Sequence, residues 1–407
     1  MKYLLITSIF PPINGGSAVV YEKIAEYCAD HALIVLAPKR HCATNEWLEG
    51  WQQYDSTAPF QVVRTTLLRP LVVVSKSRLQ SLYLFLCKDI PLYLKILRLS
   101  VKLIKQHDIK VVCIGELNSL GWLGIALKRL LGIKLICYIH GEEVTTDTPY
   151  RNFSRNRKHY LKHADALVAV SKFTRDYLIN GFRVPEDKIT LIPNGVDLNV
   201  FAPAEKSAAL LQRYNLQHKK IMLTVGRLVP RKGIDKTIEA MPAIISAVPD
   251  VHYLIVGIGP YQEKLKQLVQ QYGLQDYVTF TGKISQQELV QHYQLCDVFI
   301  MANRTMPDGD TEGFGLVFLE ANACGKPVVG GKAGGAVEAV QHGYNGLSVN
   351  GYQSAEIADA VTLLLTDDAK YQQISQNGLA LVQQCRFERC AERFDQLCKQ
   401  LSGKIDG

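Results

Sequence analysis

Residues 4–28, "LLITSIFPPINGGSAVVYEKIAEYC", join an apolar strand-like run to an amphipathic helical pattern through a turn rich in proline and glycine. A strand that enters such a turn and then a helix begins a βαβ unit, and the helix N-terminus favours an anion. The spacing G-x-G-x-x-G is missing because Gly15 and Gly16 are adjacent, and no acidic residue ends a clear second strand about 20 residues later. We therefore expect a parallel α/β fold. Its first turn either approaches a ligand other than NAD or is a tight turn that binds no ligand.

The same rhythm continues along the 407 residues and predicts two domains. Apolar runs alternate with helical patterns, as in parallel sheets with crossover helices. The rhythm pauses in a polar segment at 201–220 and then restarts. We predict one domain over residues 1–200, a second over 201–385, and a final helical stretch at 386–407 that packs back on the first. The expected strands beyond the first are 110–115, 133–141, 166–171, 188–195, 221–226, 251–257, 277–282, 297–302 and 326–331.

Composition places the chain among globular proteins, with 47% hydrophobic and 21% charged residues. The apolar run Tyr3 to Phe10 is only a strand's length and lacks a cleavage site, so we expect a cytoplasmic protein. Ten cysteines occur without a C-x-x-C pair, and those at 28, 113, 137, 296 and 324 have apolar neighbours. This pattern predicts buried free thiols in place of a disulfide framework or metal cluster.

The formal charge of +8 belongs to the first half of the chain. Residues 1–200 carry 26 Lys and Arg against 17 Asp and Glu, and the remainder carries 20 against 21. Residues 64–110 alone hold ten basic side chains against Asp89 and Asp108. Such a block predicts an anionic partner, either a membrane surface, a phosphorylated lipid or nucleic acid.

A helix is expected from about Ile90 to Lys105, with Asp89 as its cap and Pro91 in the first turn. Apolar residues such as Tyr93 and Leu97 occupy much of its surface, but charges interrupt them too often for a transmembrane span. The helix is either interfacial, lying on anionic lipid, or a core helix with a solvated stripe. One side of it carries Lys95, Arg98, Lys102 and Lys105.

Two stretches of the second domain carry the expected chemistry. In "DTEGFGLVFLEANACGKPVVGGKAGG", residues 310–335, Glu312 precedes a predicted helix and Glu320 lies on it. Carboxylates only accept hydrogen bonds and therefore suit sugar hydroxyls, although a helix-dipole partner and a solvated helix face would use the same residues. In "VGRLVPRKGID", residues 225–235, Arg227 and Lys232 stand between a strand and a helix N-terminus. They are either surface charges or the counter-charges of a diphosphate leaving group.

These motifs, taken in order, resemble the retaining nucleotide-sugar glycosyltransferases of family 4. The resemblance covers nearly the whole chain and implies the GT-B fold, an α/β fold of two Rossmann-like domains facing across a cleft. The matching elements are "FPPINGG", the "HG" of His140 and Gly141, "IPNGVD" (192–197), "GRLVPRKG", "LIVGIGP" (254–260), "FTGKIS" (280–285), the E-x7-E of Glu312 and Glu320, and "GGAVEAV" (334–340).

The resemblance implies a donor site in the second domain. Arg227 and Lys232 would hold the donor diphosphate. Glu312 would bind sugar hydroxyls far from the anomeric carbon, and Glu320 would bind the ribose. The further donor-binding residues that it implies are Gly257, Lys283, Ile284, Phe314, Gly315 and Leu316.

In the first domain the resemblance places His140 near the anomeric centre. Gly15 and Gly16 would let their loop approach the donor phosphate and the acceptor. The implied catalytic residues are His140, Arg227, Lys232 and Glu312, with no metal and no cofactor. The implied reaction retains the anomeric configuration without a side-chain nucleophile.

Two patterns suggest metal but have poor contexts. Asp308 and Asp310 form a D-x-D, which binds a divalent ion in the other large glycosyltransferase fold. Here it lies in a polar loop beside the E-x7-E, so we interpret it as a chance occurrence. His159 and His163 are four apart, but no third ligand accompanies them, and we expect surface histidines.

The run from "GRLVPRKGID" to "EANACGKPVVGG" resembles the lipid-directed mannosyltransferases that use GDP-mannose. We therefore expect transfer of a hexose, best assigned as mannose, to a lipid or lipid-linked glycan at an anionic membrane surface, on its cytoplasmic face and without nucleic acid. Alternatives are a UDP-sugar donor with a soluble or polysaccharide acceptor, and a nucleotide-sugar 2-epimerase that needs no acceptor. A noncatalytic membrane-binding protein would need only the basic segment.

Overall fold

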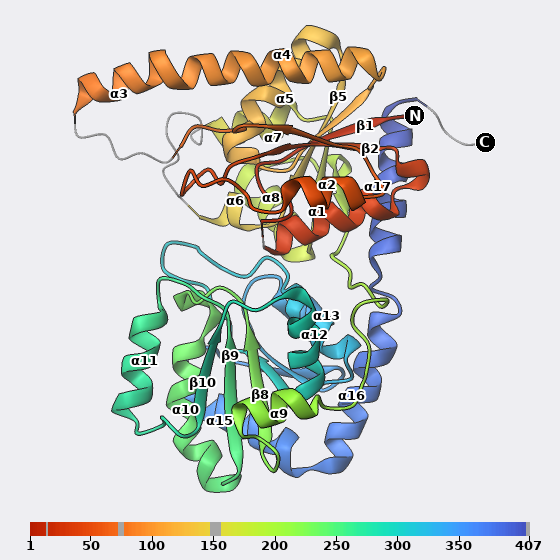
Figure 1. Ribbon diagram of the computed structural model, residues 1–407. Coiled ribbons are helices and arrows are strands. Elements are labelled where there is room, and N and C mark those ends of the chain that lie inside the picture. The colour runs from red at the N-terminus through yellow and green to blue at the C-terminus, as the bar shows by residue number, and fades with distance from the viewer. Residues whose placement is uncertain (14, 72–76, 147–155, 404–407) are drawn as a thin grey trace. The chain divides into compact units, whose positions relative to one another are not determined.

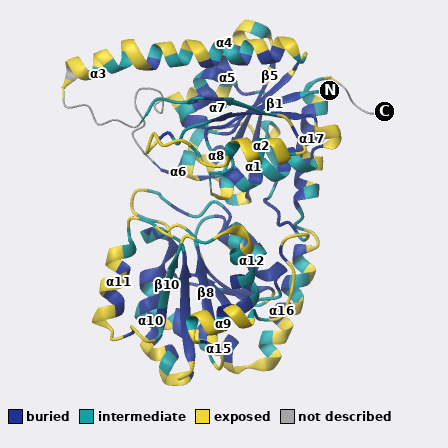
Figure 2. Cartoon of the chain, in the orientation of Figure 1, coloured by how far each residue is buried: buried dark blue, intermediate teal, exposed yellow. Residues whose placement is uncertain are grey.

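The computed structural model describes residues 1–13, 15–71, 77–146 and 156–403 (Figure 1). The chain forms two compact units, each with its own parallel sheet. The first unit comprises Met1–Val170, Thr174–Pro193 and Phe387–Gly407, and the second comprises Ser171–Phe173 and Asn194–Arg386. In both units the strands are the most buried elements, while the helices expose one side (Figure 2).

The first unit contains a sheet of seven strands in the order β3-β2-β1-β4-β5-β6-β7. All neighbouring strands are parallel. The sequence predicted five of them and missed β2 and β3. The strands are β1 (Tyr3–Ile6), β2 (Leu33–Pro38), β3 (Val62–Thr65), β4 (Val111–Ile114), β5 (Lys134–Ile139), β6 (Ala166–Ala169) and β7 (Ile189–Leu191).

Helices cover both faces of this sheet (Figure 1). Leu4 and Ile6 of β1 pack in one core with residues of α4 and α5, so the alternate residues of β1 face the opposite side, where α1 packs against α17. The final helix therefore belongs to the first unit. The helices are α1 (Gly16–Tyr27), α2 (Trp51–Thr57), α3 (Arg78–Leu84), α4 (Ile90–Gln106), α5 (Leu117–Leu131), α6 (Glu142–Thr145), α7 (Arg157–His163), α8 (Lys172–Phe182) and α17 (Phe387–Leu401).

The second unit contains six parallel strands in the order β10-β9-β8-β11-β12-β13. The sequence predicted all of them except β13. The strands are β8 (Lys220–Val225), β9 (Val251–Val256), β10 (Val278–Gly282), β11 (Val298–Met301), β12 (Val328–Gly331) and β13 (Gly346–Val349). The helices are α9 (Ala208–Tyr214), α10 (Ile234–Ala247), α11 (Gln262–Gln271), α12 (Gln286–Leu295), α13 (Leu316–Ala323), α14 (Ala336–Ala339), α15 (Ser354–Thr366) and α16 (Asp368–Val382).

The strand order reverses direction once in each sheet. The reversal lies between β1 and β4 in the first unit and between β8 and β11 in the second. Loops at the carboxyl ends of neighbouring strands diverge at such a point and leave a crevice, where open α/β sheets bind their ligands. The two predicted Rossmann-like sheets are confirmed.

The basic helix of the first unit differs from its predicted form. Helical backbone continues from α3 through a π-helical turn, Phe85–Asp89, into α4. Asp89 lies inside this stretch with helical φ and ψ and makes no capping hydrogen bond, so its predicted role as the cap was wrong. The cap is Ser77, whose hydroxyl accepts a hydrogen bond from the backbone N–H of Gln80 at 3.2 Å.

The predicted apolar face of α4 packs against the protein core. Tyr93 packs on Trp122, with 4.8 Å between ring centroids, and Leu97 is half-buried against the core. Apolar side chains are exposed along α3 and the π-helical turn, and Leu94 of α4 is exposed as well. The exposed apolar side chains of α3 and the turn are Leu79, Leu82, Tyr83 and Leu86. The four predicted basic residues Lys95, Arg98, Lys102 and Lys105 are all exposed.

Two further observations concern the chain as a whole. The five cysteines predicted to be buried free thiols are buried and free. Among the described residues, no helix is both long enough and apolar enough to cross a membrane.

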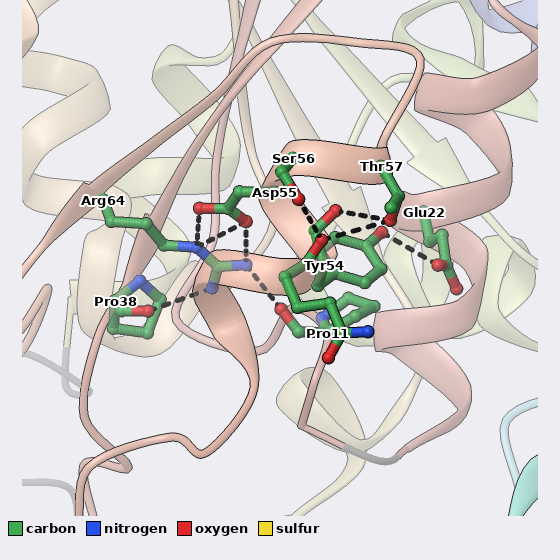
Figure 3. Close-up of polar contacts among 9 residues, drawn as sticks. Pro11, Glu22, Pro38, Tyr54, Asp55, Ser56, Thr57 and Arg64 are labelled. Carbon is green, nitrogen blue, oxygen red and sulfur yellow. Dashed lines mark hydrogen bonds and ion pairs between the residues drawn. The ribbon is translucent and has the colours of Figure 1, made fainter.

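One basic side chain of the 64–110 block is an internal clamp. Arg64 is 2% exposed and forms an ion pair with Asp55 at 2.8 Å. Its other N–H groups donate to the carbonyl oxygens of Pro38 at 3.0 Å and Pro11 at 2.6 Å (Figure 3). Arg64 therefore ties the proline turn after β1 to β2 and α2, and it does not contribute to a surface for anionic partners.

We expect Arg64→Ala to destabilise the first unit by about 3–5 kcal/mol, because it leaves Asp55 and the Pro11 carbonyl without their charged partner. Urea unfolding followed by tryptophan fluorescence measures this, since the three tryptophans, 47, 51 and 122, all belong to the first unit. The control is Lys110→Ala, which breaks an ion pair whose members are 54% and 84% exposed and should change little. If Arg64→Ala lowered the free energy of unfolding no more than Lys110→Ala does, the Arg64 contacts would contribute nothing to stability.

Candidate functional site

A buried ion pair lies at the carboxyl ends of the second unit's strands. Lys232, in the 3-10 turn Pro230–Lys232 before α10, donates to Glu312 Oε2 from Nζ at 2.7 Å. Their side chains are 11% and 12% exposed. Gly233 has φ +69°, and a Cβ there would lie 1.9 Å from the Ala302 carbonyl oxygen. Only glycine therefore allows this turn to pack against the end of β11.

Charge keeps Glu312 ionised. Burial by itself raises the pKa of Glu312, but the cations of Lys232 and Arg231 outweigh burial and hold the pKa below its usual value. The backbone around Glu312 is fixed as well, because its carbonyl accepts from the Gly335 N–H at 2.8 Å. A Cβ at Gly334 would lie 2.1 Å from that carbonyl oxygen, which explains the paired glycines of "GGAVEAV".

Glu320 occupies a different environment on α13. Its Oε2 accepts a hydrogen bond from the Tyr293 hydroxyl at 2.6 Å. Burial raises the pKa of Glu320 to about 7, although the Tyr293 hydrogen bond and Lys232 both act to lower it. The two carboxylates of the E-x7-E therefore differ in charge near neutral pH. Lys232 influences both of them, so the structure gathers this predicted set into one place.

The backbones of the loops after β8 and β9 touch each other, and the loop after β8 carries an exposed arginine. Gly257 has φ +130°, and a Cβ there would lie 2.0 Å from the Gly226 carbonyl oxygen, so these two turns touch. Arg227, between them in sequence, is exposed and forms no hydrogen bond or ion pair with any described residue. Its guanidinium is thus available to a ligand at this edge.

The remaining predicted donor residues follow β10 or begin α13. Lys283 is exposed and Ile284 half-buried directly after β10. Gly315 is the N-cap of α13 with φ +90°, Phe314 before it is buried, and Leu316 is the first helical residue. Their backbone N–H groups lie at a helix N-terminus, which favours an anionic or strongly polar ligand.

The D-x-D aspartates have protein contacts. Asp310 Oδ2 lies 3.4 Å from Arg231 Nη1, and Asp308 Oδ1 accepts from the Asp310 N–H at 3.1 Å. Arg231 was missed by the sequence analysis, although it stands beside Lys232 in "VPRKG". In the described part of the chain, no three His, Cys, Asp or Glu residues are placed to hold a metal ion. His159 is exposed, and its ring packs against that of His163 at 4.1 Å.

A separate cavity of about 130 Å³ lies in the first unit at the ends of β1, β4 and β5. The Ser8 hydroxyl donates to Glu116, whose carboxylate also lies 3.6 Å from Arg69 Nη1. No sequence motif joins Ser8, Arg69 and Glu116, because the order of the strands in the sheet, and not their spacing in the chain, brings them together. The lining residues are Ile9, Ser17, Arg69, Gly115, Glu116, Asn118, Ser119, His140, Glu142, Glu143 and Thr146.

His140 lines this cavity as a neutral imidazole. Burial lowers the pKa of His140 to about 3. The backbone N–H groups of His140 and Gly141 donate to the Glu143 carboxylate at 3.1 and 2.9 Å. Burial raises the pKa of Glu143 to about 7, against the effect of these bonds. Glu143, the fourth residue after β5, thereby holds the turn that leaves this strand.

Gly15 and Gly16 lie at the start of α1, where Gly15 is the N-cap. Both are exposed, and a Cβ at Gly15 would meet nothing within 4 Å. The backbone at this position is therefore open to a ligand, and no internal contact requires the missing side chain of Gly15.

Comparison with known proteins finds two family models along the chain. "Glycosyltransferase Family 4" matches residues 13–200, and "Glycosyl transferases group 1" matches residues 209–380. The chain is 35% identical over 378 residues to the GDP-mannose-dependent alpha-(1-6)-phosphatidylinositol monomannoside mannosyltransferase of Mycolicibacterium smegmatis, with 89% of each chain covered.

Two solved structures have the same fold. HepE of Anabaena in complex with UDP and glucose superposes with a TM-score of 0.77 at 23% identity, covering 99% of both chains. The sucrose-phosphate synthase of Thermosynechococcus elongatus superposes with a TM-score of 0.78 at 25% identity, covering 100% of both.

We expect Glu320→Gln to stabilise the second unit at pH 8. The folded-state pKa of about 7 lies above the unfolded value of 4.5, so folding stability falls as pH rises through this window. The loss is on the order of 3 kcal/mol above pH 7, and a neutral amide does not incur it. Urea unfolding by circular dichroism at pH 8 and pH 5 measures the difference, which should shrink at the lower pH. A gain that is the same at both pH values would contradict the raised pKa.

Proposed function

Because this chain belongs to glycosyltransferase family 4, we propose that it transfers a mannosyl residue from GDP-mannose to a lipid or lipid-linked saccharide acceptor. The observation that carries the proposal is the buried Lys232–Glu312 pair, which places a cation and an ionised carboxylate together at the carboxyl ends of the second unit's strands. A nucleotide sugar needs both, since its diphosphate is anionic and its sugar offers hydroxyl donors. The mannosyltransferase relative, which covers most of the chain, supports the choice of donor and acceptor class.

In this proposal the donor binds the second unit through charge. Arg227 and Lys232 contact the diphosphate, because Arg227 is exposed and bonds to no residue that the structure describes, and Lys232 Nζ can donate beyond its bond to Glu312. Glu312 accepts hydrogen bonds from the hexose hydroxyls and Glu320 from the ribose. Backbone groups at the N-terminus of α13 contact sugar and phosphate, and the residues after β10 hold the base.

The proposed chemistry is a substitution with retention. The acceptor hydroxyl approaches the anomeric carbon on the side of the leaving diphosphate, the new glycosidic bond forms as the bond to phosphate breaks, and the hydroxyl proton passes to the departing phosphate oxygen. No side-chain nucleophile takes part. Arg227, Lys232 and the α13 N-terminus stabilise the charge that develops on the diphosphate. Because these groups already counter its charge, we propose that transfer needs no metal ion.

A panel of nucleotide sugars tests the proposal directly. Release of nucleoside diphosphate should be fastest with GDP-mannose and should increase when a lipid fraction containing phosphatidylinositol mannosides is added, with full activity in excess chelator. The anomeric configuration of the product, read by NMR, should match that of the donor. Preference for a UDP-sugar, donor conversion without acceptor, or strict need for a divalent ion would each overturn the corresponding part.

Removing a donor contact should slow turnover. Glu312→Gln exchanges an anionic acceptor for a neutral amide, and Lys232→Ala deletes a charge beside the leaving group, so each should lower kcat by about 10²-fold or more. Steady-state kinetics measures this, with folding checked by circular dichroism. Lys266→Ala is the matched control, because it breaks an exposed ion pair on α11 whose members are 45% and 79% exposed. Near-normal turnover in both site variants would refute the donor-site assignment.

We further propose that the acceptor is taken from an anionic membrane surface, on its cytoplasmic face. Four exposed basic residues of α4 continue along the helix from the exposed apolar residues of α3 and the π-helical turn. Basic residues near such a surface contribute about 1 kcal/mol each and are screened by salt, whereas exposed leucines can enter the headgroup region. The surface thus combines a charged and an apolar part on one long helix (Figure 1).

Reversing the charged part should release the protein from anionic vesicles. The quadruple variant Lys95→Glu, Arg98→Glu, Lys102→Glu and Lys105→Glu should lose binding at low salt and lose transfer to a membrane-embedded acceptor far more than donor hydrolysis. Vesicle sedimentation measures the binding. A control with the same change in net charge reverses exposed lysines elsewhere, namely Lys158, Lys162, Lys264 and Lys266. If the two variants bind anionic vesicles equally well, or if the wild type does not bind them, the four basic residues of α4 face solvent and do not bind a membrane.

A further inference from the structure

The ring of His140 is locked between two tyrosines of the first unit. Tyr138 stacks on it with 5.1 Å between centroids and an interplanar angle of 27°. Tyr21 of α1 meets it edge-on, at 5.1 Å and 79°, and the Tyr21 hydroxyl lies 2.9 Å from His140 Nε2. The orientation of the imidazole in the cavity is therefore set by its neighbours and not by a ligand.

The hydrogen bonds of Tyr21 determine which ring nitrogen carries the proton. A tyrosine hydroxyl has one hydrogen, and a carbonyl oxygen can only accept. The Tyr21 hydroxyl makes a short hydrogen bond to the Gly115 carbonyl, so its single hydrogen is donated there. The remaining contact, from Nε2 to the Tyr21 oxygen, then requires a hydrogen on Nε2. A neutral imidazole with Nε2–H leaves Nδ1 as an acceptor.

Gly115 makes this arrangement possible. A Cβ at position 115 would lie 2.8 Å from Tyr21 Cζ and 2.9 Å from its hydroxyl oxygen, closer than real side chains allow. The residue directly after β4 must therefore be glycine for the Tyr21 hydroxyl to reach the carbonyl. No described residue hydrogen-bonds His140 Nδ1, and His140 lines the cavity that also contains Glu116 and Arg69.

We propose that Tyr21 is a positioning residue that fixes His140 as the Nε2–H tautomer, so that Nδ1 accepts a hydrogen bond from a sugar hydroxyl in this cavity. The identity of the ligand as a sugar rests on the proposed function, whereas the tautomer follows from the Tyr21 and Gly115 contacts alone. Donor and acceptor both carry hydroxyls, so the shared chemistry is a hydroxyl donor. If Nδ1 carried the hydrogen, it would meet that hydroxyl as a second donor and would demand an acceptor instead.

The tautomer can be observed without any substrate. In protein labelled with ¹⁵N-histidine, long-range proton–nitrogen spectra distinguish a protonated ring nitrogen from an unprotonated one. The signals of His140 among the ten histidines are those lost in His140→Gln. We expect Nε2 protonated and Nδ1 unprotonated between pH 6 and 8. A protonated Nδ1, or an imidazolium in that range, would overturn the proposal whatever the enzyme's substrate.

Removing one hydroxyl then tests its role. Tyr21→Phe keeps the ring but deletes the acceptor of Nε2–H, so the spectrum should show a mixture of tautomers. The matched control is Tyr138→Phe, which keeps the stacked ring and deletes a buried hydroxyl that has no hydrogen-bond partner within the described part of the chain. This control should keep the wild-type tautomer. If Tyr138→Phe changed the tautomer as much as Tyr21→Phe, the effect would belong to packing and not to the hydrogen bond.

Kinetics complete the test and identify the hydroxyl. We expect Tyr21→Phe to lower kcat about tenfold or more relative to Tyr138→Phe, since the wrong tautomer removes a hydrogen bond from the reacting complex. Loss in donor hydrolysis without acceptor would place the hydroxyl on the donor, and loss in transfer alone would place it on the acceptor. Equal kcat in the two variants, with the tautomer changed, would show that Nδ1 contacts no substrate. Failure of every sugar donor would refute the proposed function but leave the spectral result standing.

Discussion

The ion pair between Lys232 and Glu312 is the constraint on which the second unit's site depends. An enclosed carboxylate keeps its charge only if cations offset the cost of burial, and Lys232 with Arg231 do so. The ion pair in turn requires two glycines, one beside the backbone of each partner. Gly233 lets the Lys232 turn pack on the end of β11, and Gly334 lets the following loop support the Glu312 carbonyl.

The two glutamates of one motif have been given different properties by their surroundings. Glu312 faces cations and stays ionised, whereas Glu320 faces a tyrosine hydroxyl in an enclosed place and has a pKa of about 7. Glu312 is thus an acceptor at all neutral pH values. Glu320 can take up a proton near neutral pH. The presence or absence of nearby cations therefore decides whether each of these enclosed carboxyl groups is charged.

In the first unit, buried polar side chains hold the loops that surround the cavity. The proline turn after β1 is held by the Arg64 guanidinium, and the turn after β5 is held by Glu143. His140 sits between Tyr21 and Tyr138. In each case a buried polar group bonds to loop backbone or to a neighbouring side chain, and these bonds hold the turns after β1 and β5 in place.

The sequence by itself determined the class of fold and marked the charged residues of the second unit as candidates for a site. Apolar runs that end in glycine predicted most of the strands, because buried parallel strands are continuously apolar and their exits need unusual backbone. Local spacing within the E-x7-E and "GRLVPRKG" marked Glu312 and Lys232 as candidates, and the family resemblance implied one donor for both. β2, β3 and β13 escaped prediction. β3 and β13 have only four residues each, whereas β2, Leu33–Pro38, is a fully buried apolar run that was missed although its pattern is continuous.

Only the tertiary structure decided which charges face inward. Arg64 looked like part of a basic surface, yet the sheet brings it to Asp55 and Pro11 and buries it. The apolar residues near Tyr93 looked free to meet lipid, yet α5 covers them and leaves α3 exposed instead. The cavity around His140 gathers residues from distant segments, such as Tyr21 and Gly115, which meet only because β1, β4 and β5 are neighbours in the sheet. Contacts between segments far apart in the chain leave no local spacing, and for that physical reason the sequence could not show them.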